Sequence, residues 1–276
     1  MIRLGAHISI AGGLDRALER GTSIGCEAIQ VFLKNNMQWT GKPLTAGEVA
    51  RFKARTLPVF AHSCYLINLA TPHRHVRTKS VAALVEEIER ATVLDVPFIV
   101  MHPGAHLGSG EAAGLRAVAG SLDEVFRATR RSAVKIALET TAGQGTNLGY
   151  RFEHLAEILQ RSHFPERLAV CVDTCHLLAA GYDIRTPKGY AATMSQLDAT
   201  IGRRCVVAFH LNDSKKPLGS RVDRHEHIGQ GQIGLTGFRH VLRDPRWRNL
   251  PMVLETPKSE DMHEDVENLR VLRNLL

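Results

Sequence analysis

Six short apolar runs of this chain each end on a side chain that can bind a metal ion. Parallel strands bring their carboxyl ends together at one edge of a sheet, where α/β proteins carry their chemistry. If the runs are such strands, three imidazoles and three carboxylates meet there, a ligand mixture that suits zinc, manganese or iron rather than calcium. The pattern therefore predicts a metalloenzyme. The runs are residues 59–62, 98–102, 136–139, 168–173, 206–210 and 252–255, and they end on His62, His102, Glu139, Asp173, His210 and Glu255.

Two further segments add ligand-type side chains. His176 follows the strand-end carboxylate Asp173 by three residues, and Asp223 and His225 stand two apart, so they face the same way in an extended chain. His176, Asp223 and His225 together can hold another cation. His227 lies outside this pair, and we interpret it as a solvated or supporting residue. A single strand-end histidine or acid is ordinarily a cap or a loop contact, but six of them are hard to explain that way.

Two more apolar runs, residues 2–4 and 28–33, bring the expected strands to eight. Helical spacing of apolar residues lies between them, over residues 81–88, 115–125 and 152–159, and Thr45 with Glu48 forms a capping box that starts a helix. Alternating strands and helices over this length predict an α/β fold, a TIM (β/α)8 barrel, with a doubly wound open sheet as the alternative. No linker composition divides the chain, so we expect a single domain over residues 1–276. The longest connections, residues 140–150 and 211–234, are expected to build the active site.

Composition limits the class of protein. The 276 residues are 44% hydrophobic, enough for one large core, and the five cysteines lack C-x-x-C spacing, which favours reduced thiols in a cytoplasmic protein. No stretch is apolar enough for a signal peptide or a membrane span, so no membrane partner is expected. A net charge of +7 suits a polyanionic partner or a merely soluble basic surface. Nothing points to an obligate protein partner, and a monomer is the default.

Residues 229–234 fit the pattern G-x-G-x-x-G, which binds dinucleotides when it follows an apolar strand. The preceding residues 221–227 are charged, so the context is wrong. We interpret this segment as a flexible loop at the barrel mouth.

Several long polar motifs in this order resemble those of endonuclease IV, the trinuclear zinc family of apurinic/apyrimidinic endonucleases. The resemblance covers the chain from Ile2 to about Glu255. The segments that carry it are residues 5–7 (GAH), 65–69 (YLINL), 102–104 (HPG), 139–145 (ETTAGQG), 173–176 (DTCH), 210–215 (HLNDSK) and 223–225 (DRH).

The resemblance implies three zinc ions, with manganese or iron as possible occupants of some sites. One zinc would bind His62, His102 and Glu139, and Glu139 would bridge to a second zinc held by Asp173, His210 and Glu255. The third would bind His176, Asp223 and His225. The implied reaction is hydrolysis of the phosphodiester 5′ to an abasic site in duplex DNA, leaving a 3′-hydroxyl and a 5′-deoxyribose phosphate. Glu139 would be the catalytic residue that holds and deprotonates the attacking water.

The family also implies DNA repair in the cytoplasm, at the nucleoid in a bacterium, and trimming of blocked 3′ ends. Two loops would enter the minor groove at the lesion, and two arginines are our choice for phosphate contacts. Ordinary loop packing is the alternative for Trp39 and Tyr65, and solvated surface charge for the arginines. Well-known members carry arginine where this chain has Met37, an apolar wedge of a kind that DNA-kinking proteins use. The expected DNA-binding residues are Asn35, Met37, Gln38, Trp39, Tyr65, Leu66, Arg221 and Arg224.

Two other functions remain open at this point. A sugar isomerase or epimerase of the xylose isomerase-like barrel type would use Glu139, Asp173, His210 and Glu255, but it leaves the other ligand-type residues without a purpose. A DNA-binding module with structural zinc would have a closed, cysteine-rich site.

Overall fold

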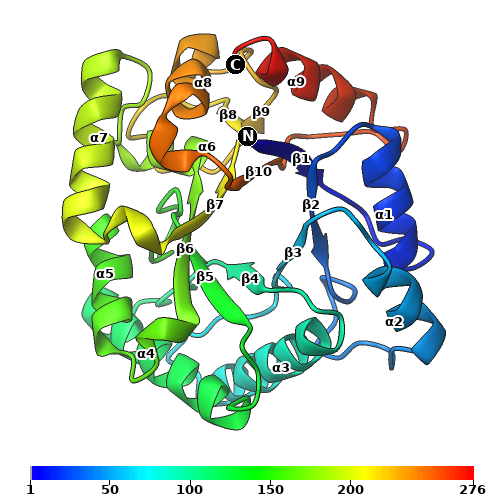
Figure 1. Ribbon diagram of the computed structural model, residues 1–276. Coiled ribbons are helices and arrows are strands. Elements are labelled where there is room, and N and C mark those ends of the chain that lie inside the picture. Colours follow the sequence, from blue (N-terminus) through cyan, green and yellow to red (C-terminus); the bar gives the residue numbers. More distant parts are fainter. Residues whose placement is uncertain (1) are drawn as a thin grey trace.

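The computed structural model describes residues 2–276 and shows a closed barrel of parallel strands surrounded by helices (Figure 1). Around the barrel the strands follow the order β1-β10-β7-β6-β5-β4-β3-β2, and β1 pairs with both β2 and β10. This closure confirms the (β/α)8 prediction and makes the open-sheet alternative wrong. The strands are β1 Arg3–His7, β2 Ala28–Phe32, β3 Val59–His62, β4 Phe98–Met101, β5 Lys135–Glu139, β6 Leu168–Asp173, β7 Val206–His210 and β10 Pro251–Leu254.

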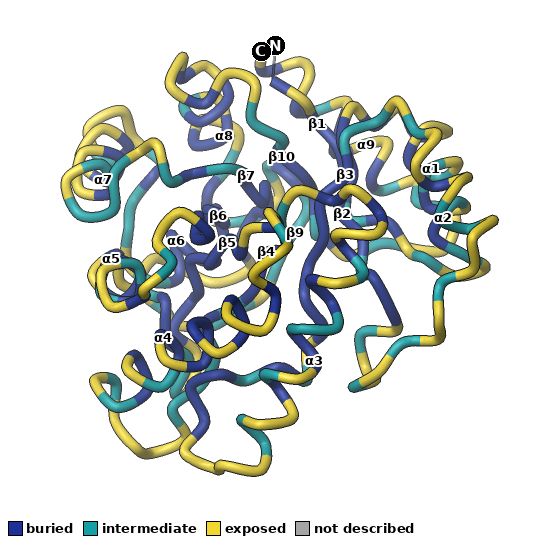
Figure 2. Tube along the Cα trace, turned by 60° about the horizontal axis from the view of Figure 1, so that its bottom comes forward, coloured by how far each residue is buried: buried dark blue, intermediate teal, exposed yellow. Residues whose placement is uncertain are grey.

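Side chains alternate across each strand, which separates two apolar layers. One set faces the barrel axis, where space is limited, and these residues are mostly small: Val100, Ala137, Ala169, Cys171, Ala208 and Val253, with Phe60 stacked on Phe98. The other set packs outward against the helices in the main core. Figure 2 shows the same division as buried strands within a ring of helices that are exposed on their outer sides.

The helices form the outer layer, and their local sequences explain their ends. The expected capping box is present, since the Thr45 hydroxyl accepts from the Glu48 N–H and the Glu48 carboxylate accepts from the Thr45 N–H. The helices are α1 Leu14–Ser23, α2 Ala46–Lys53, α3 Arg74–Val93, α4 Glu111–Ala128, α5 Phe152–Arg161, α6 Thr174–Ala180, α7 Pro187–Thr200, α8 Gly234–Arg243 and α9 His263–Arg273, with short 3-10 turns at Pro165–Arg167, Arg203–Cys205 and Pro245–Trp247.

Some predicted boundaries were wrong. The first strand extends to His7 rather than ending at Leu4, and β4 and β10 end one residue before His102 and Glu255. Residues 174–176, which follow the predicted strand end at Asp173, are the start of α6. The long loop 211–234 contains a small antiparallel pair, β8 Asp213–Ser214 with β9 His225–Glu226. Such pairing depends on contacts between distant segments that local apolar patterns do not show.

Gly5 is required where β1 meets β2. A Cβ at this position would lie 1.7 Å from the carbonyl oxygen of Ala28, so any side chain would force the two strands apart. The close approach places His7 beside Gln30 in the paired strands.

Two other sequence predictions concern cysteines and membranes. Cys26, Cys64, Cys171 and Cys175 are buried, Cys205 is partly exposed, and all five are free thiols. No helix within residues 2–276 is long and apolar enough to cross a membrane.

Candidate metal centre

Glu139 lies at the centre of the barrel mouth, fully buried at the end of β5. His62 Nε2 and His102 Nε2 each lie 3.2 Å from its Oε2. His210 Nδ1 lies 2.9 Å from the other oxygen, Oε1, and His176 Nδ1 lies 3.3 Å from it. The two oxygens of one carboxylate thus face two different groups of histidines.

A second group surrounds His210 at the end of β7. Its Nδ1 lies 3.1 Å from Glu255 Oε2 and 3.9 Å from Asp173 Oδ2. The ligand-type atoms of Glu139, Asp173, His210 and Glu255 all lie within 4.8 Å of one another, as do those of His62, His102 and Glu139. The ends of six strands therefore converge on two groups that share Glu139.

A third group joins α6 to β9 and the residues just before it. His176 Nε2 lies 3.1 Å from Asp223 Oδ2, and His225 Nε2 lies 3.3 Å from Asp223 Oδ1. Asp173 accepts a hydrogen bond from the His176 N–H as the cap of α6, which fixes the imidazole above the strand end. The nine predicted ligand positions thus form three groups, and each group satisfies the same 4.8 Å limit.

Backbone carbonyls orient three of the imidazoles. His62 Nδ1 faces the carbonyl oxygen of Ser63 at 2.8 Å, His176 Nδ1 that of Thr140 at 2.8 Å, and His225 Nδ1 that of Glu255 at 3.1 Å. A carbonyl requires the proton at Nδ1, so it leaves the lone pair of Nε2 free toward the site, as metal-binding histidines require.

The third group passes a test for a bound cation. The Nε2 atoms of His176 and His225 are buried and have no hydrogen-bond partner among the described residues, although a carboxylate lies within 3.3 Å of each. Buried polar atoms normally have a partner. Lone pairs that converge beside a carboxylate fit an ion shared between them, and the histidine and carboxylate donors suit zinc.

The charges of the cluster also favour a cation. Burial alone would lower the pKa of His176, but Asp173 and Asp223 raise it well above its usual value. Burial alone would raise the pKa of Glu139, but His210 and His102 hold it well below its usual value. The carboxylates of such a site attract positive charge, and a metal ion competes with protons for the nitrogen and oxygen atoms.

Two supporting residues, Gln30 and His7, had no role assigned from the sequence, although His7 belongs to the segment 5–7 that carries the family resemblance. Gln30 accepts from His210 Nε2 at 2.8 Å and donates to Glu255 Oε1 at 2.5 Å, and its amide nitrogen lies 2.8 Å from His7 Nδ1. It therefore aligns ligand-type residues from two strands. The sequence contained evidence for Gln30, because it is a polar residue within an apolar run. Its side chain also lies on the side of β2 that faces the barrel axis.

Asn212 is another supporting residue that sequence analysis did not select. Its amide nitrogen donates to Asp173 Oδ2 at 2.6 Å, and its amide oxygen accepts from the Glu255 N–H at 2.7 Å. His227, which we expected outside the metal groups, lies outside them and contacts Asn268 at 3.1 Å.

The glycine-rich segment 229–234 surrounds a carboxylate of the same chain. Asp213, buried in β8, accepts hydrogen bonds from the N–H groups of Gly229, Gly231, Ile233 and Gly234. We expected a flexible loop at the barrel mouth, but these bonds anchor the segment to Asp213 in β8. In a dinucleotide-binding loop such N–H groups would bind a phosphate, but here they bind the carboxylate of Asp213. The segment therefore fits the G-x-G-x-x-G pattern while its anion site is occupied by a residue of the same chain.

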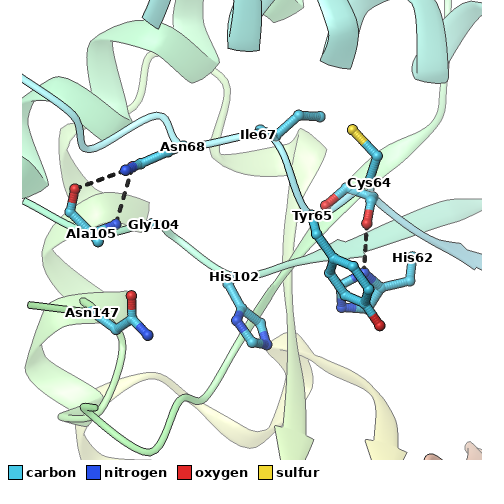
Figure 3. Close-up of a pocket in the computed structure, with 10 residues that line it drawn as sticks. His62, Cys64, Tyr65, Ile67, Asn68, His102, Gly104, Ala105 and Asn147 are labelled. Atoms are coloured by element: carbon cyan, nitrogen blue, oxygen red, sulfur yellow. Dashed lines mark hydrogen bonds between the residues drawn. The ribbon is translucent and has the colours of Figure 1, made fainter. Parts of the chain in front are cut away.

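A cavity of about 240 Å³ opens beside His62 and His102 (Figure 3). Tyr65 stands next to His62 on one side, and Asn147 lies on the opposite side. Asn68 joins the walls, because its amide bonds both the N–H and the carbonyl of Ala105 at 3.0 Å. The side chains of His62 and His102 therefore form part of the cavity wall.

The expected DNA-binding residues differ in exposure. The side chains of Met37 and Tyr65 are exposed, as are Asn35 and Gln38. Trp39 and Leu66 are half-buried and pack against the core, the ordinary alternative for Trp39. A role in DNA contact stays a prediction for all six positions.

The two arginines near the third group are exposed and held by local contacts. The Arg221 guanidinium lies 4.1 Å from the centre of the Tyr150 ring, and Arg224 donates to the Asp223 carbonyl at 2.6 Å. Both remain candidates for phosphate contacts.

Residues 18–275 match the family model described as a xylose isomerase-like TIM barrel. A protein of Chloroflexus aurantiacus named "Probable endonuclease 4" is 52% identical, and the alignment covers 100% of this chain and 99% of the relative. The chain belongs to the endonuclease IV family. The crystal structure of endonuclease IV from Thermus thermophilus matches with a TM-score of 0.87 and 37% identity, covering 99% of this chain and 98% of that one. Family membership confirms the expected class of hydrolase.

The sugar-epimerase alternative shares only the barrel with this endonuclease IV family member. A D-tagatose 3-epimerase-like protein matches with a TM-score of 0.73 but at 18% identity, covering 99% of this chain and 96% of that one. At that level the likeness concerns the fold alone.

Proposed function

We propose that this protein is a DNA-repair endonuclease that hydrolyses the phosphodiester 5′ to an abasic site in duplex DNA. The products would be a 3′-hydroxyl and a 5′-deoxyribose phosphate. The observation that carries the proposal is Glu139, whose two oxygens face two separate histidine groups at the mouth of a barrel of the endonuclease IV family. We further propose that residues 1–276 form one domain and act in the cytoplasm, at the nucleoid in a bacterium.

Three zinc ions are the proposed cofactors. His62, His102 and Glu139 would hold one, Asp173, His210 and Glu255 would hold a second with Glu139 as the bridge, and the third would take His176, Asp223 and His225. Bound zinc supplies positive charge that lowers the pKa of water and offsets charge on phosphate and leaving oxygen. Manganese or iron could replace zinc at some positions, because these ligands suit all three metals.

The residues of the chain have separable tasks in this proposal. Glu139 would hold the attacking water and take its proton, a role supported by its burial and by the histidines that keep it ionised. Gln30 and Asn212 would keep His210, Glu255 and Asp173 in place through the hydrogen bonds described above. Such fixed geometry spares the site reorganisation during the reaction.

The substrate would lie across the mouth. Asn35, Met37, Gln38 and Tyr65 would fill the gap at the lesion while the abasic nucleotide leaves the stack and enters the cavity beside His62 and His102. Trp39 and Leu66 would support these loops from their half-buried positions. Arg221 and Arg224 would contact phosphates. Trimming of blocked 3′ ends would use the same site.

Incision of an end-labelled duplex with one abasic-site analogue tests the proposal. The purified protein, without added magnesium, should cut once, 5′ to the lesion, and leave a 3′ end that a polymerase extends. Failure to cut after zinc and manganese are supplied would refute it. The summed content of zinc, manganese and iron per chain, measured in parallel, should approach three, and a sum of one or two would refute the trinuclear part alone.

A further inference from the structure

Two charged side chains, Lys34 and Glu87, are buried beneath the loops that follow β2 and β3. Each side chain is only 1% exposed, and Lys34 Nζ lies 3.5 Å from Glu87 Oε1. Replacing a buried ion pair with apolar residues is often neutral or stabilising, so stability alone does not explain it. Neither residue belongs to the three metal groups.

Lys34 connects the two ends of the loop after β2. Its Nζ donates to the carbonyl oxygen of Trp39 at 2.6 Å, across the segment that contains Met37. The same Nζ lies 3.6 Å from Glu86 Oε2 on α3. One buried ammonium therefore closes the loop and joins it to the helix.

The side chains of α3 hold this loop at further points. Arg90 donates to the carbonyl of Leu33 at 2.9 Å and to that of Lys42 at 2.7 Å, and Glu86 accepts from the Gly41 N–H at 2.7 Å. Both ends of residues 33–42 are thus fixed to one face of a twenty-residue helix.

Glu87 extends the same support to the loop after β3. Its Oε1, the oxygen that faces Lys34, also accepts from the Cys64 N–H at 3.1 Å. One residue farther, the Tyr65 N–H donates to the Asn36 carbonyl at 3.2 Å and joins the two loops directly. The Lys34–Glu87 pair is therefore the point where both loops and α3 meet.

The tips above this support are exposed. Met37 is 63% exposed and Tyr65 is 65% exposed, and Asn35 caps the turn by accepting from the Met37 N–H at 2.9 Å. A fixed base lets the tips keep one orientation before substrate arrives, and this reduces the entropy lost on binding.

We propose that Lys34 and Glu87 are positioning residues for lesion recognition, because they fix the two loops whose exposed tips, Met37 and Tyr65, would enter the duplex. The inference rests on the proposed function. It assigns the pair a role in binding duplex DNA and none in the chemical step.

The variant Lys34→Met tests the role, because methionine keeps the length of the side chain and removes the bond to Trp39. The dissociation constant for an abasic duplex should rise about tenfold or more, while the single-turnover incision rate at saturating enzyme stays within about twofold. An unchanged dissociation constant, or an equal loss in the saturated rate, would overturn the proposal.

Trp39 provides a readout besides activity. The chain has two tryptophans, and the other, Trp247, is 1% exposed in the 3-10 turn that precedes β10. Acrylamide quenching therefore reports mainly on Trp39. Quenching of Lys34→Met should exceed that of the wild type, and identical quenching would mean that Lys34 does not hold the loop.

A double variant separates positioning from stability. Lys34→Met alone leaves Glu87 buried without its partner, whereas Lys34→Met/Glu87→Gln removes both charges and keeps an acceptor for the Cys64 N–H. We expect the thermal midpoint to recover in the double variant while the affinity for abasic DNA stays low, because the bond to Trp39 is still missing. Recovery of both together would assign the pair a purely structural role.

Arg167→Met is the matched control, since Arg167 is also a buried cation that binds backbone carbonyls, those of Val134 and Thr129, but at the amino end of β6. It should lower the thermal midpoint without changing DNA affinity or Trp39 quenching. If the wild-type protein fails to incise abasic DNA, the proposed function fails, while the quenching result still decides whether Lys34 fixes the loop.

Discussion

The interior of the barrel and its mouth use the same strands for opposite purposes. Residues that face the axis inside the barrel are apolar and mostly small, and the residues two positions farther along the same strands or just beyond their ends are acids and histidines. The pairs are Val100 and His102, Ala137 and Glu139, Cys171 and Asp173, Ala208 and His210, and Val253 and Glu255. Two residues along each strand therefore separate the apolar interior from the candidate metal ligands. Substitutions in the interior should change stability, and substitutions of the ligands should change activity.

The largest effect is expected at Glu139. Glu139→Gln keeps the size of the side chain and removes the carboxylate that faces both histidine groups, so single-turnover incision of abasic DNA should fall about 10⁴-fold. The thermal midpoint should stay close to that of the wild type, because the apolar barrel interior is untouched. Residual activity within tenfold of the wild type would contradict the role of Glu139.

The third metal group gives the next largest effect. His176→Ala should reduce incision about a hundredfold and remove close to one metal ion per chain, measured by atomic emission. His227→Ala is the control, because His227 follows His225 by two residues in the chain but lies outside the group. Equal losses in the two variants, or near-normal activity of His176→Ala, would argue against a functional third site.

The apolar side of the comparison is tested at Val253, which is fully buried two residues before Glu255. Val253→Ala should lower the free energy of unfolding by about 2 kcal/mol, roughly thirtyfold in the equilibrium. Incision at 25 °C should remain within about twofold of the wild type. A large drop in rate with unchanged stability, seen in denaturant titration, would show that interior packing and chemistry are coupled after all.

The smallest effect is expected at the rim of the mouth. Met37→Arg adds one positive charge to an exposed loop tip, and abasic-DNA affinity should increase a few-fold at low salt, with a steeper dependence of affinity on salt. Met37→Leu should behave like the wild type. A changed single-turnover rate with unchanged binding would place Met37 in the chemical step instead.

Much of the candidate site was visible in the sequence because it depends on local order. Apolar runs that end on acids or histidines predicted which side chains gather at the mouth, and the capping box at Thr45 predicted the start of α2. His7 was missed as a strand end because the first apolar run stops at Leu4 while β1 continues to His7. Apolar periodicity does not mark a strand that ends in glycine, alanine and a polar residue.

The roles of Gln30, Asn212 and Asp213 could not be predicted from local sequence patterns. Gln30 bonds His210, 180 positions away in the chain, and Asp213 organises the glycine-rich loop through backbone groups. The burial of Lys34 and Glu87 could not be predicted either, because in the sequence both look like ordinary surface charges. Burial of a charge becomes visible only when a distant element covers it.

The sequence by itself determined the alternation of strands and helices, the inward parity of the ligand-type residues and the family of the chain, because each depends on the order of neighbouring residues. Tertiary structure alone decided which carboxylate oxygen faces which histidine, which polar residues orient the ligands and how α3 supports two loops. The physical reason is that closing the barrel brings distant segments within hydrogen-bond distance, and no short pattern in the sequence records those contacts.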